Sequence, residues 1–236
     1  MVEIKGLEKF SSRDFPGHIS STVFLGGCTF RCPYCHNAEL VLRPETLQTI
    51  PVEIFLAYLD GRKGWLEAVC VSGGEPLLHD DVEDLVRVVR DRGLLVKLDT
   101  NGSFPDRLEK LLREGLLDWV AMDVKAPLER YREVTRSNVE VEAVVRSADL
   151  IRHSGVRSTF RTTVVPGLVG RGDIVRIGEW LRGAESYLIQ QFEPHSTIDP
   201  AYLEKRPYGR EELEAMVETA RPFFKEARLE GPVYEK

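Results

Sequence analysis

The chain has 236 residues and a formal net charge of −6 at neutral pH. This length suits one α/β domain with a full core, and no Pro/Gly/Ser-rich linker divides it, so we expect a single domain over residues 1–236. An acidic balance without clustered basic residues argues against a nucleic-acid surface, and no apolar run reaches membrane-spanning length.

The first 18 residues carry scattered charges and no apolar core of signal-peptide length. We therefore expect a cytoplasmic protein whose thiols stay reduced. This expectation also disfavours disulfides.

Short apolar runs rich in β-branched residues alternate with stretches of helical period, as in βα units. The expected strands are 19–25, 68–72, 94–100, 119–124, 156–165 and 187–192. The expected helices are 52–59, 81–92, 106–113, 138–153, 173–182 and 211–225. Six units are too few to close an eight-stranded barrel, so we predict an α/β fold that forms a partial (β/α)6 barrel of parallel strands.

Local signals refine the expected helix ends. Ser137-Asn-Val-Glu140 is typical of a capping box at the start of the fourth helix. Glycines at 93, 115, 155 and 183 fall where helices should stop.

Polar, glycine-rich or cysteine-rich segments follow each expected strand. They are a loop with three cysteines at 28–35, called the cysteine loop below, and the segments 73–76, 99–102, 123–125, 166–167 and 193–195. Because function gathers at the carboxyl ends of parallel strands, these loops predict one site on one rim.

Cys28, Cys32 and Cys35 form a C-x3-C-x2-C pattern. An iron-sulfur cube normally takes four thiolates, so three indicate a cluster with one iron open to another ligand. A zinc site completed by His36 is an alternative, although zinc modules usually use two separated pairs of ligands. Covalent haem attachment at Cys32-Pro-Tyr-Cys35-His36 is another, but it requires export. Cys70 lies between valines in an expected strand, as a buried core residue would.

The cysteine pattern, with Tyr34 before its last cysteine and His36-Asn37 after it, resembles the signature of the radical S-adenosylmethionine (SAM) enzymes. Ser72-Gly-Gly-Glu-Pro76 looks like the strand end with which they hold the methionine part of SAM. The resemblance implies a barrel of the radical SAM type. It also implies one 4Fe-4S cluster on Cys28, Cys32 and Cys35, and SAM cleavage to a 5'-deoxyadenosyl radical.

Further segments are similar to the activating enzymes of glycyl radical enzymes, namely Asp14-Phe-Pro-Gly17, Asp99-Thr-Asn-Gly102, Met122-Asp-Val-Lys125 and Val164-Val-Pro-Gly167. Residues 190–194 look most like the activating proteins of anaerobic ribonucleoside-triphosphate reductase, and pyruvate formate-lyase activases are near relatives by motif. The resemblance implies a radical SAM oxidoreductase that abstracts hydrogen from a backbone glycine of a partner, first of all anaerobic ribonucleotide reductase. A pyruvate formate-lyase-type activase, an enzyme acting on a small molecule or another peptide, and a non-enzymatic zinc module are the alternatives.

The resemblance also implies roles for single residues. Tyr34 would lie by the adenine, and the rest of SAM would be bound by Gly73, Gly74, Glu75, Asp123, Lys125, Arg161 and His195. Asp99, Thr100 and Asp123 would form part of a monovalent-cation site, and Asp14 would meet the glycyl loop of the partner. One spare cysteine cannot hold a second cube, so flavodoxin or ferredoxin would donate the electron.

Overall fold

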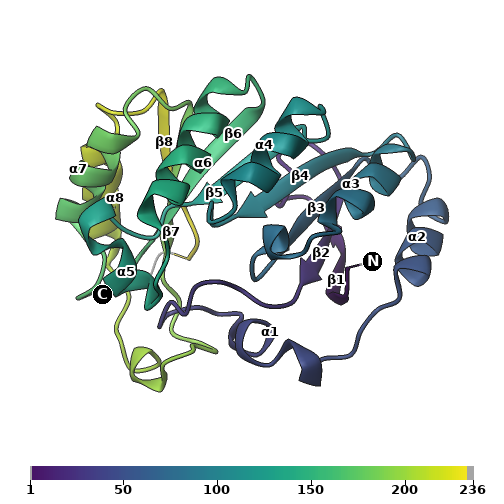
Figure 1. Ribbon diagram of the computed structural model, residues 1–236. Coiled ribbons are helices and arrows are strands. Elements are labelled where there is room, and N and C mark those ends of the chain that lie inside the picture. Colours follow the sequence, from purple (N-terminus) through teal and green to yellow (C-terminus); the bar gives the residue numbers. More distant parts are fainter. Residues whose placement is uncertain (1, 233–236) are drawn as a thin grey trace.

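The computed structural model describes residues 2–232, so the outermost ends of the expected domain lie outside the described residues. One curved sheet holds the strands in chain order from one edge to the other (Figure 1). The strands are β1 (Ile4–Ser11), β2 (Ser20–Leu25), β3 (Ala68–Gly73), β4 (Leu95–Thr100), β5 (Trp119–Asp123), β6 (Arg157–Val164), β7 (Ser186–Gln191) and β8 (Glu226–Glu230).

Helices connect the strands, and Figure 1 shows α3, α4 and α6 in front of the sheet with α7 and α8 toward its last strands. Their bounds are α1 (Ala38–Leu42), α2 (Val52–Asp60), α3 (Val82–Arg90), α4 (Pro105–Arg113), α5 (Tyr131–Thr135), α6 (Val141–His153), α7 (Arg171–Trp180) and α8 (Arg210–Ala220). Crossover helices of this kind are what parallel strands require.

The predicted partial barrel is confirmed, with two strands more than expected. The six expected strands, β2 to β7, pair in parallel as predicted, and β8 continues this pairing, whereas the additional strand β1 pairs with β2 antiparallel. The link from β1 to β2 is too short for a crossover, and Gly17 turns within it at φ 86°. Within the described residues β1 and β8 lie at opposite edges, so the barrel is open.

The two faces of the sheet differ in chemistry because side chains alternate along a strand. On one face Val71, Leu98 and Val120 are fully buried in the main hydrophobic core, together with apolar side chains of the helices. The other face is polar. In its register Asp99 pairs with Ala121 and Asp123 pairs with Arg161.

The helix-end signals gave mixed results. All four expected glycines have positive φ and follow helices. The predicted capping box is wrong, because α6 begins only at Val141 and Glu140 makes no side-chain cap bond. The Ser137 hydroxyl instead pairs with Thr135, 2.8 Å away, in the turn that ends α5.

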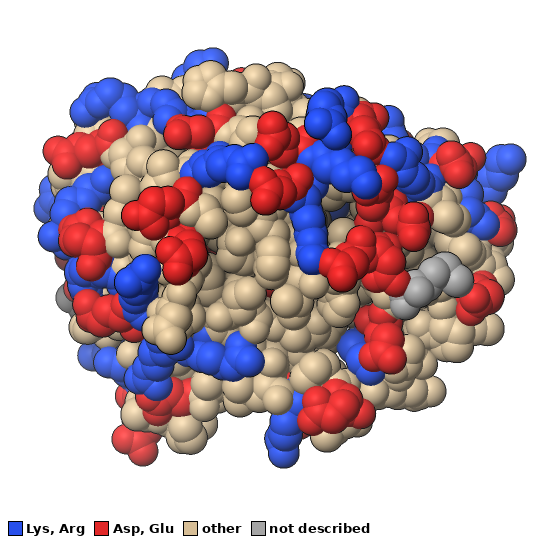
Figure 2. Space-filling model, in the orientation of Figure 1, with Lys and Arg blue, Asp and Glu red and all other residues tan. Residues whose placement is uncertain are grey.

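Charges of both signs are interleaved over the face shown in Figure 2. No helix among residues 2–232 combines the length and apolar character needed to cross a bilayer.

Candidate functional site

A cavity of about 230 Å³ lies where the cysteine loop meets the ends of the central strands. It gathers many of the predicted site residues: Cys28, Cys32, Tyr34, Cys35, Gly73, Gly74, Asp123 and Lys125. Contributions from separate loops therefore meet at one place, as expected for the carboxyl ends of parallel strands.

The three thiols are largely buried. Burial raises the pKa of Cys28 to about 11 and that of Cys32 to about 12, and it also raises the pKa of Cys35. Lys125 opposes this shift at each thiol without overcoming it. The free thiols are thus protonated near neutral pH, and metal binding must supply the energy that removes their protons.

His36 is not placed as a fourth zinc ligand. Its Nε2 lies 2.7 Å from the carbonyl oxygen of Glu193, and its ring stacks on His195 with centroids 4.4 Å apart. Among the described residues, no three His, Cys, Asp or Glu side chains are gathered around a point for a single ion. In a cube each thiolate binds a different iron, so cluster ligands need not converge on one point.

Gly73 and Gly74 bring the end of β3 against the start of the cysteine loop. Gly73 has φ 127°, and a Cβ added to Gly74 would lie 1.8 Å from the carbonyl oxygen of Gly27. Only glycine allows this approach of two backbones. The Asn37 side chain donates to the Gly73 carbonyl at 3.3 Å, which further joins the two segments.

Glu75 lies behind the cavity wall and is fully buried. Its Oε1 accepts hydrogen bonds from the Leu77 N–H at 3.0 Å and the Thr100 hydroxyl at 2.8 Å, and its Oε2 accepts one from the Asn101 N–H at 2.6 Å. Burial raises the pKa of this carboxyl to about 7 although the three donors oppose it. Glu75 and Thr100 therefore tie the end of β3 to the end of β4.

A partly buried chain of charges runs along the polar face of the sheet. Lys97 contacts Asp99 at 2.6 Å, Arg161 contacts Asp99 at 3.4 Å and Asp123 at 2.8 Å, and Lys125 contacts Asp123 at 3.1 Å. Burial alone would raise the pKa of Asp123, but Arg161 and Lys125 outweigh it and hold that pKa at about 2. Three cations thus face two carboxylates along this chain, and Asp123 and Lys125 are the pair that lines the cysteine cavity.

A second, polar cavity of about 180 Å³ adjoins the first and shares Gln190 with it. It places Asp99 and Arg161 together with Asp14, which accepts a 2.5 Å hydrogen bond from the Thr22 hydroxyl. His195 is the outlier of the predicted set, because its side chain is 61% exposed and lies on His36.

Sequence reasoning missed Asn101, Thr163 and Gln190, which line the first cavity, and Lys97, which begins the charge chain. Asn101 lay within a segment already placed on the rim. Lys97 stands two positions from Asp99 in an apolar strand, and that period-2 spacing is the signal for a shared face.

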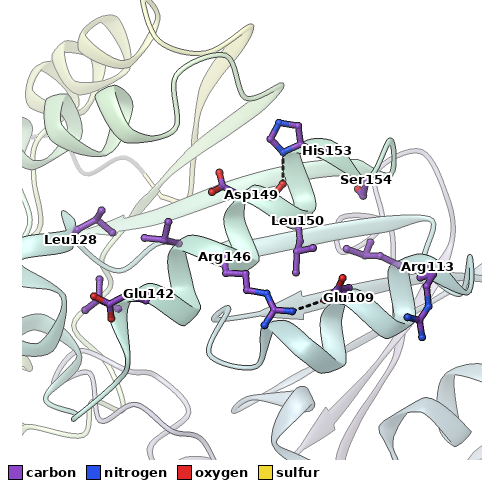
Figure 3. A pocket seen from close by; sticks show the side chains of 12 residues that line it. Glu109, Arg113, Leu128, Glu142, Arg146, Asp149, Leu150, His153 and Ser154 are labelled. Atoms are coloured by element: carbon purple, nitrogen blue, oxygen red, sulfur yellow. Dashed lines mark hydrogen bonds and ion pairs between the residues drawn. The ribbon is translucent and has the colours of Figure 1, made fainter.

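A larger cavity of about 810 Å³ lies elsewhere, on the outer face between α4 and α6 (Figure 3). Figure 3 shows Arg146 of α6 reaching Glu109 of α4 across it. None of the predicted site residues lines this cavity.

The close contact between Gly74 and the Gly27 carbonyl predicts that an alanine is tolerated less well here than at a glycine with free space around it. Gly74→Ala should lower the free energy of unfolding by about 1–3 kcal/mol, because its methyl group must push two backbones apart. Gly172→Ala in α7 is the matched control, since an added Cβ meets nothing within 4 Å there. Denaturant titration of the metal-free proteins measures both, and equal stabilities would contradict the close approach.

Glu75 should make stability depend on pH. Its pKa rises from 4.5 to about 7 on folding, so its protonated form stabilises the fold fully below pH 4.5, and this contribution is lost as the pH rises through 7. At about 1.4 kcal/mol per pKa unit the loss is about 3 kcal/mol. In Glu75→Gln the unfolding free energy of the metal-free protein should vary less over this range. The exposed control Glu53→Gln should keep the wild-type profile, and an unchanged profile in Glu75→Gln would refute the assignment.

Comparisons with known proteins agree with this geometry. A family model described as the radical SAM superfamily matches residues 22–178. A candidate glycyl-radical enzyme activating enzyme of Methanocaldococcus jannaschii is 33% identical over 229 residues, which cover 94% of this chain and 92% of that protein. The pyruvate formate-lyase 1-activating enzyme of Escherichia coli K12 is 29% identical over 187 residues, covering 76% of this chain and 74% of that protein.

Two solved structures share the fold. SuiB of Streptococcus suis bound to S-adenosylmethionine aligns with a TM-score of 0.62 at 14% identity, over 87% of this chain and 45% of that chain. Coproporphyrinogen III oxidase of Escherichia coli, a radical SAM enzyme, aligns with a TM-score of 0.57 at 14% identity, over 87% of this chain and 52% of that chain. This chain spans about half of each, and at such identity they show the fold alone.

The family model covers more than half of the chain, including the cysteine loop and the ends of β3, β4 and β5 at the cavity. The chain belongs to the radical SAM superfamily and is a radical SAM oxidoreductase.

Proposed function

We propose that this enzyme activates a glycyl radical enzyme by abstracting hydrogen from the α-carbon of a backbone glycine, and that its partner is anaerobic ribonucleotide reductase. A relative named for glycyl-radical enzyme activation spans nearly the whole chain and supports the general activity. The observation that carries the proposal is that the cysteine cavity adjoins a polar cavity in the open barrel, with Gln190 in both.

The residues present fit the cofactors that the family implies. Cys28, Cys32 and Cys35 would hold the 4Fe-4S cluster, and Lys125 supplies positive charge beside the thiolates formed on binding. When bound, the cluster supplies the electron that cleaves SAM into methionine and a 5'-deoxyadenosyl radical.

The neighbouring residues would bind SAM. Gly73 and Gly74 offer backbone groups for the methionine end, and Glu75 fixes their turn from behind. Tyr34 brings a buried hydroxyl that has no hydrogen-bond partner among the described residues, so a ligand in the cavity would satisfy it. We further assign SAM binding to Asp123 and Lys125, which line the cysteine cavity, to Arg161, which lines the polar cavity, and to His195, which stacks on His36.

The monovalent cation that the resemblance implies would meet a competitor. Arg161 already bridges Asp99 and Asp123, and the Thr100 hydroxyl donates to Glu75. A cation at Asp99, Thr100 and Asp123 would have to displace these contacts, so we do not include it in the proposal.

The polar cavity suits a polypeptide substrate. Asp14, Lys97 and Arg161 present donors and acceptors that match backbone amide groups, and within the described residues β1 and β8 do not pair, which leaves the barrel open. We propose that the glycyl loop of the partner enters here and meets Asp14.

The electron source in this proposal is a separate flavodoxin or ferredoxin. Cys70 is buried within β3, so it is not placed to hold a second cluster with the other three cysteines. All four cysteines are free, which suits a reducing compartment such as the cytoplasm.

Anaerobic reconstitution tests the activity and the partner together. The enzyme with iron, sulfide, SAM, a reductant and ribonucleotide reductase should give a glycyl radical in the electron paramagnetic resonance spectrum, with methionine and 5'-deoxyadenosine as products. A radical on pyruvate formate-lyase alone would correct the partner. SAM cleavage without a radical on either protein would refute the activase assignment.

The four cysteines provide a matched comparison. Cys35→Ala should lose the cluster and all SAM cleavage, because the cavity then offers two thiolates. Cys70→Ala should keep both, since this residue packs inside the sheet. Iron and sulfide analysis checks the result, and loss of the cluster in Cys70→Ala alone would overturn the ligand assignment.

A further inference from the structure

Asn101 places a side-chain donor against one of the three cysteines. It follows β4 directly, and only 4% of its surface is exposed. Its Nδ2 lies 3.5 Å from the Cys28 sulfur and 3.2 Å from the Thr29 hydroxyl oxygen. The amide therefore reaches from the end of one strand to the loop that follows another.

The orientation of this amide is fixed by its other contacts. The Oδ1 accepts a hydrogen bond from the Ser103 N–H at 2.9 Å, which an NH₂ group in that place could not do. The Asn101 backbone N–H donates to Glu75 at 2.6 Å. With the oxygen and the backbone both held, the NH₂ group must face Cys28.

A second donor approaches the same sulfur, because the Phe30 N–H lies 3.4 Å from it. Hydrogen bonds to cluster sulfurs stabilise the more negative, reduced state of an iron-sulfur cluster and so raise its reduction potential. We propose that Asn101 is a positioning residue that hydrogen-bonds the cluster ligand Cys28 and raises the reduction potential of the cluster.

This inference rests on the cluster and not on the identity of the protein partner. The reaction concerned is the one-electron reduction of the [4Fe-4S]²⁺ state to [4Fe-4S]⁺ by an external reductant. Without the amide donor this reduction becomes harder, and a donor protein of fixed potential reduces a smaller fraction of the enzyme.

A redox titration without SAM or partner tests the proposal. The reconstituted enzyme is titrated with titanium(III) citrate, and reduction is followed by visible absorption and electron paramagnetic resonance. Asn101→Leu should shift the midpoint to a more negative potential, and Asn101→Asp should shift it further because it adds a carboxylate. Ser103→Ala is the control. It removes only the hydroxyl that lies 2.9 Å from Thr29 and keeps the backbone N–H that holds Asn101, so its midpoint should equal that of the wild type.

Wild-type midpoints in both Asn101 variants, with full iron content, would overturn the proposal. If Asn101 only holds the loops in place, its variants should have a lower iron content or thermal stability, and the clusters that do assemble should keep the wild-type midpoint potential.

A second measurement needs no variant to fold. Wild-type enzyme labelled with ¹⁵N at the asparagine side-chain amides should show ¹⁵N hyperfine coupling to the reduced cluster. The chain has three asparagines, and Asn37→Asp should leave this coupling in place. Its absence in the wild type would refute the hydrogen bond even if the Asn101 variants lose the cluster. Either result stands whether or not a glycyl radical forms on a partner.

Discussion

The site depends on a partly buried chain of charges in the sheet. Three adjacent strands, β4, β5 and β6, bring four charged residues to the polar face: Lys97, Asp99, Asp123 and Arg161. Lys125, two residues beyond the end of β5, adds a fifth charge through its contact with Asp123. Each ion alone would cost several kcal/mol to bury, so the arrangement is stable only while the strand register keeps opposite charges in contact. The register of the strands therefore also fixes the arrangement of charges beside the cavity.

A second layer of contacts holds the loops on this wall. Glu75 joins the ends of β3 and β4, while Gly74 lets the β3 turn touch the cysteine loop. Both residues shape the site through the backbone, because each determines where the backbone groups around the cavity lie. The family motif thus includes residues that build the site as well as residues that line it.

Much of this arrangement could be predicted from the sequence. The six interior strands are short runs of mostly buried residues, and the segments that follow the first four of them contribute residues to the cysteine cavity, whereas 166–167 and 193–195 do not line it. By contrast β1 and β8 each carry three charged residues, as edge strands often do, and α1 and α5 are too short to show a helical period. The sequence could not reveal that the Glu75 carboxylate accepts hydrogen bonds from groups of the protein itself, or that the Asn101 amide faces Cys28. Both sets of contacts join residues far apart in the sequence.

The buried thiols have a consequence for how the enzyme matures. The metal-free cavity holds protonated sulfurs beside the fixed cation Lys125, with the pKa of Cys32 at about 12. Inserting iron and sulfide must expel those protons from a confined space, so maturation and deprotonation are one event. Alkaline conditions consequently favour loading, and acid favours release of the metal, even where the folded chain is unchanged.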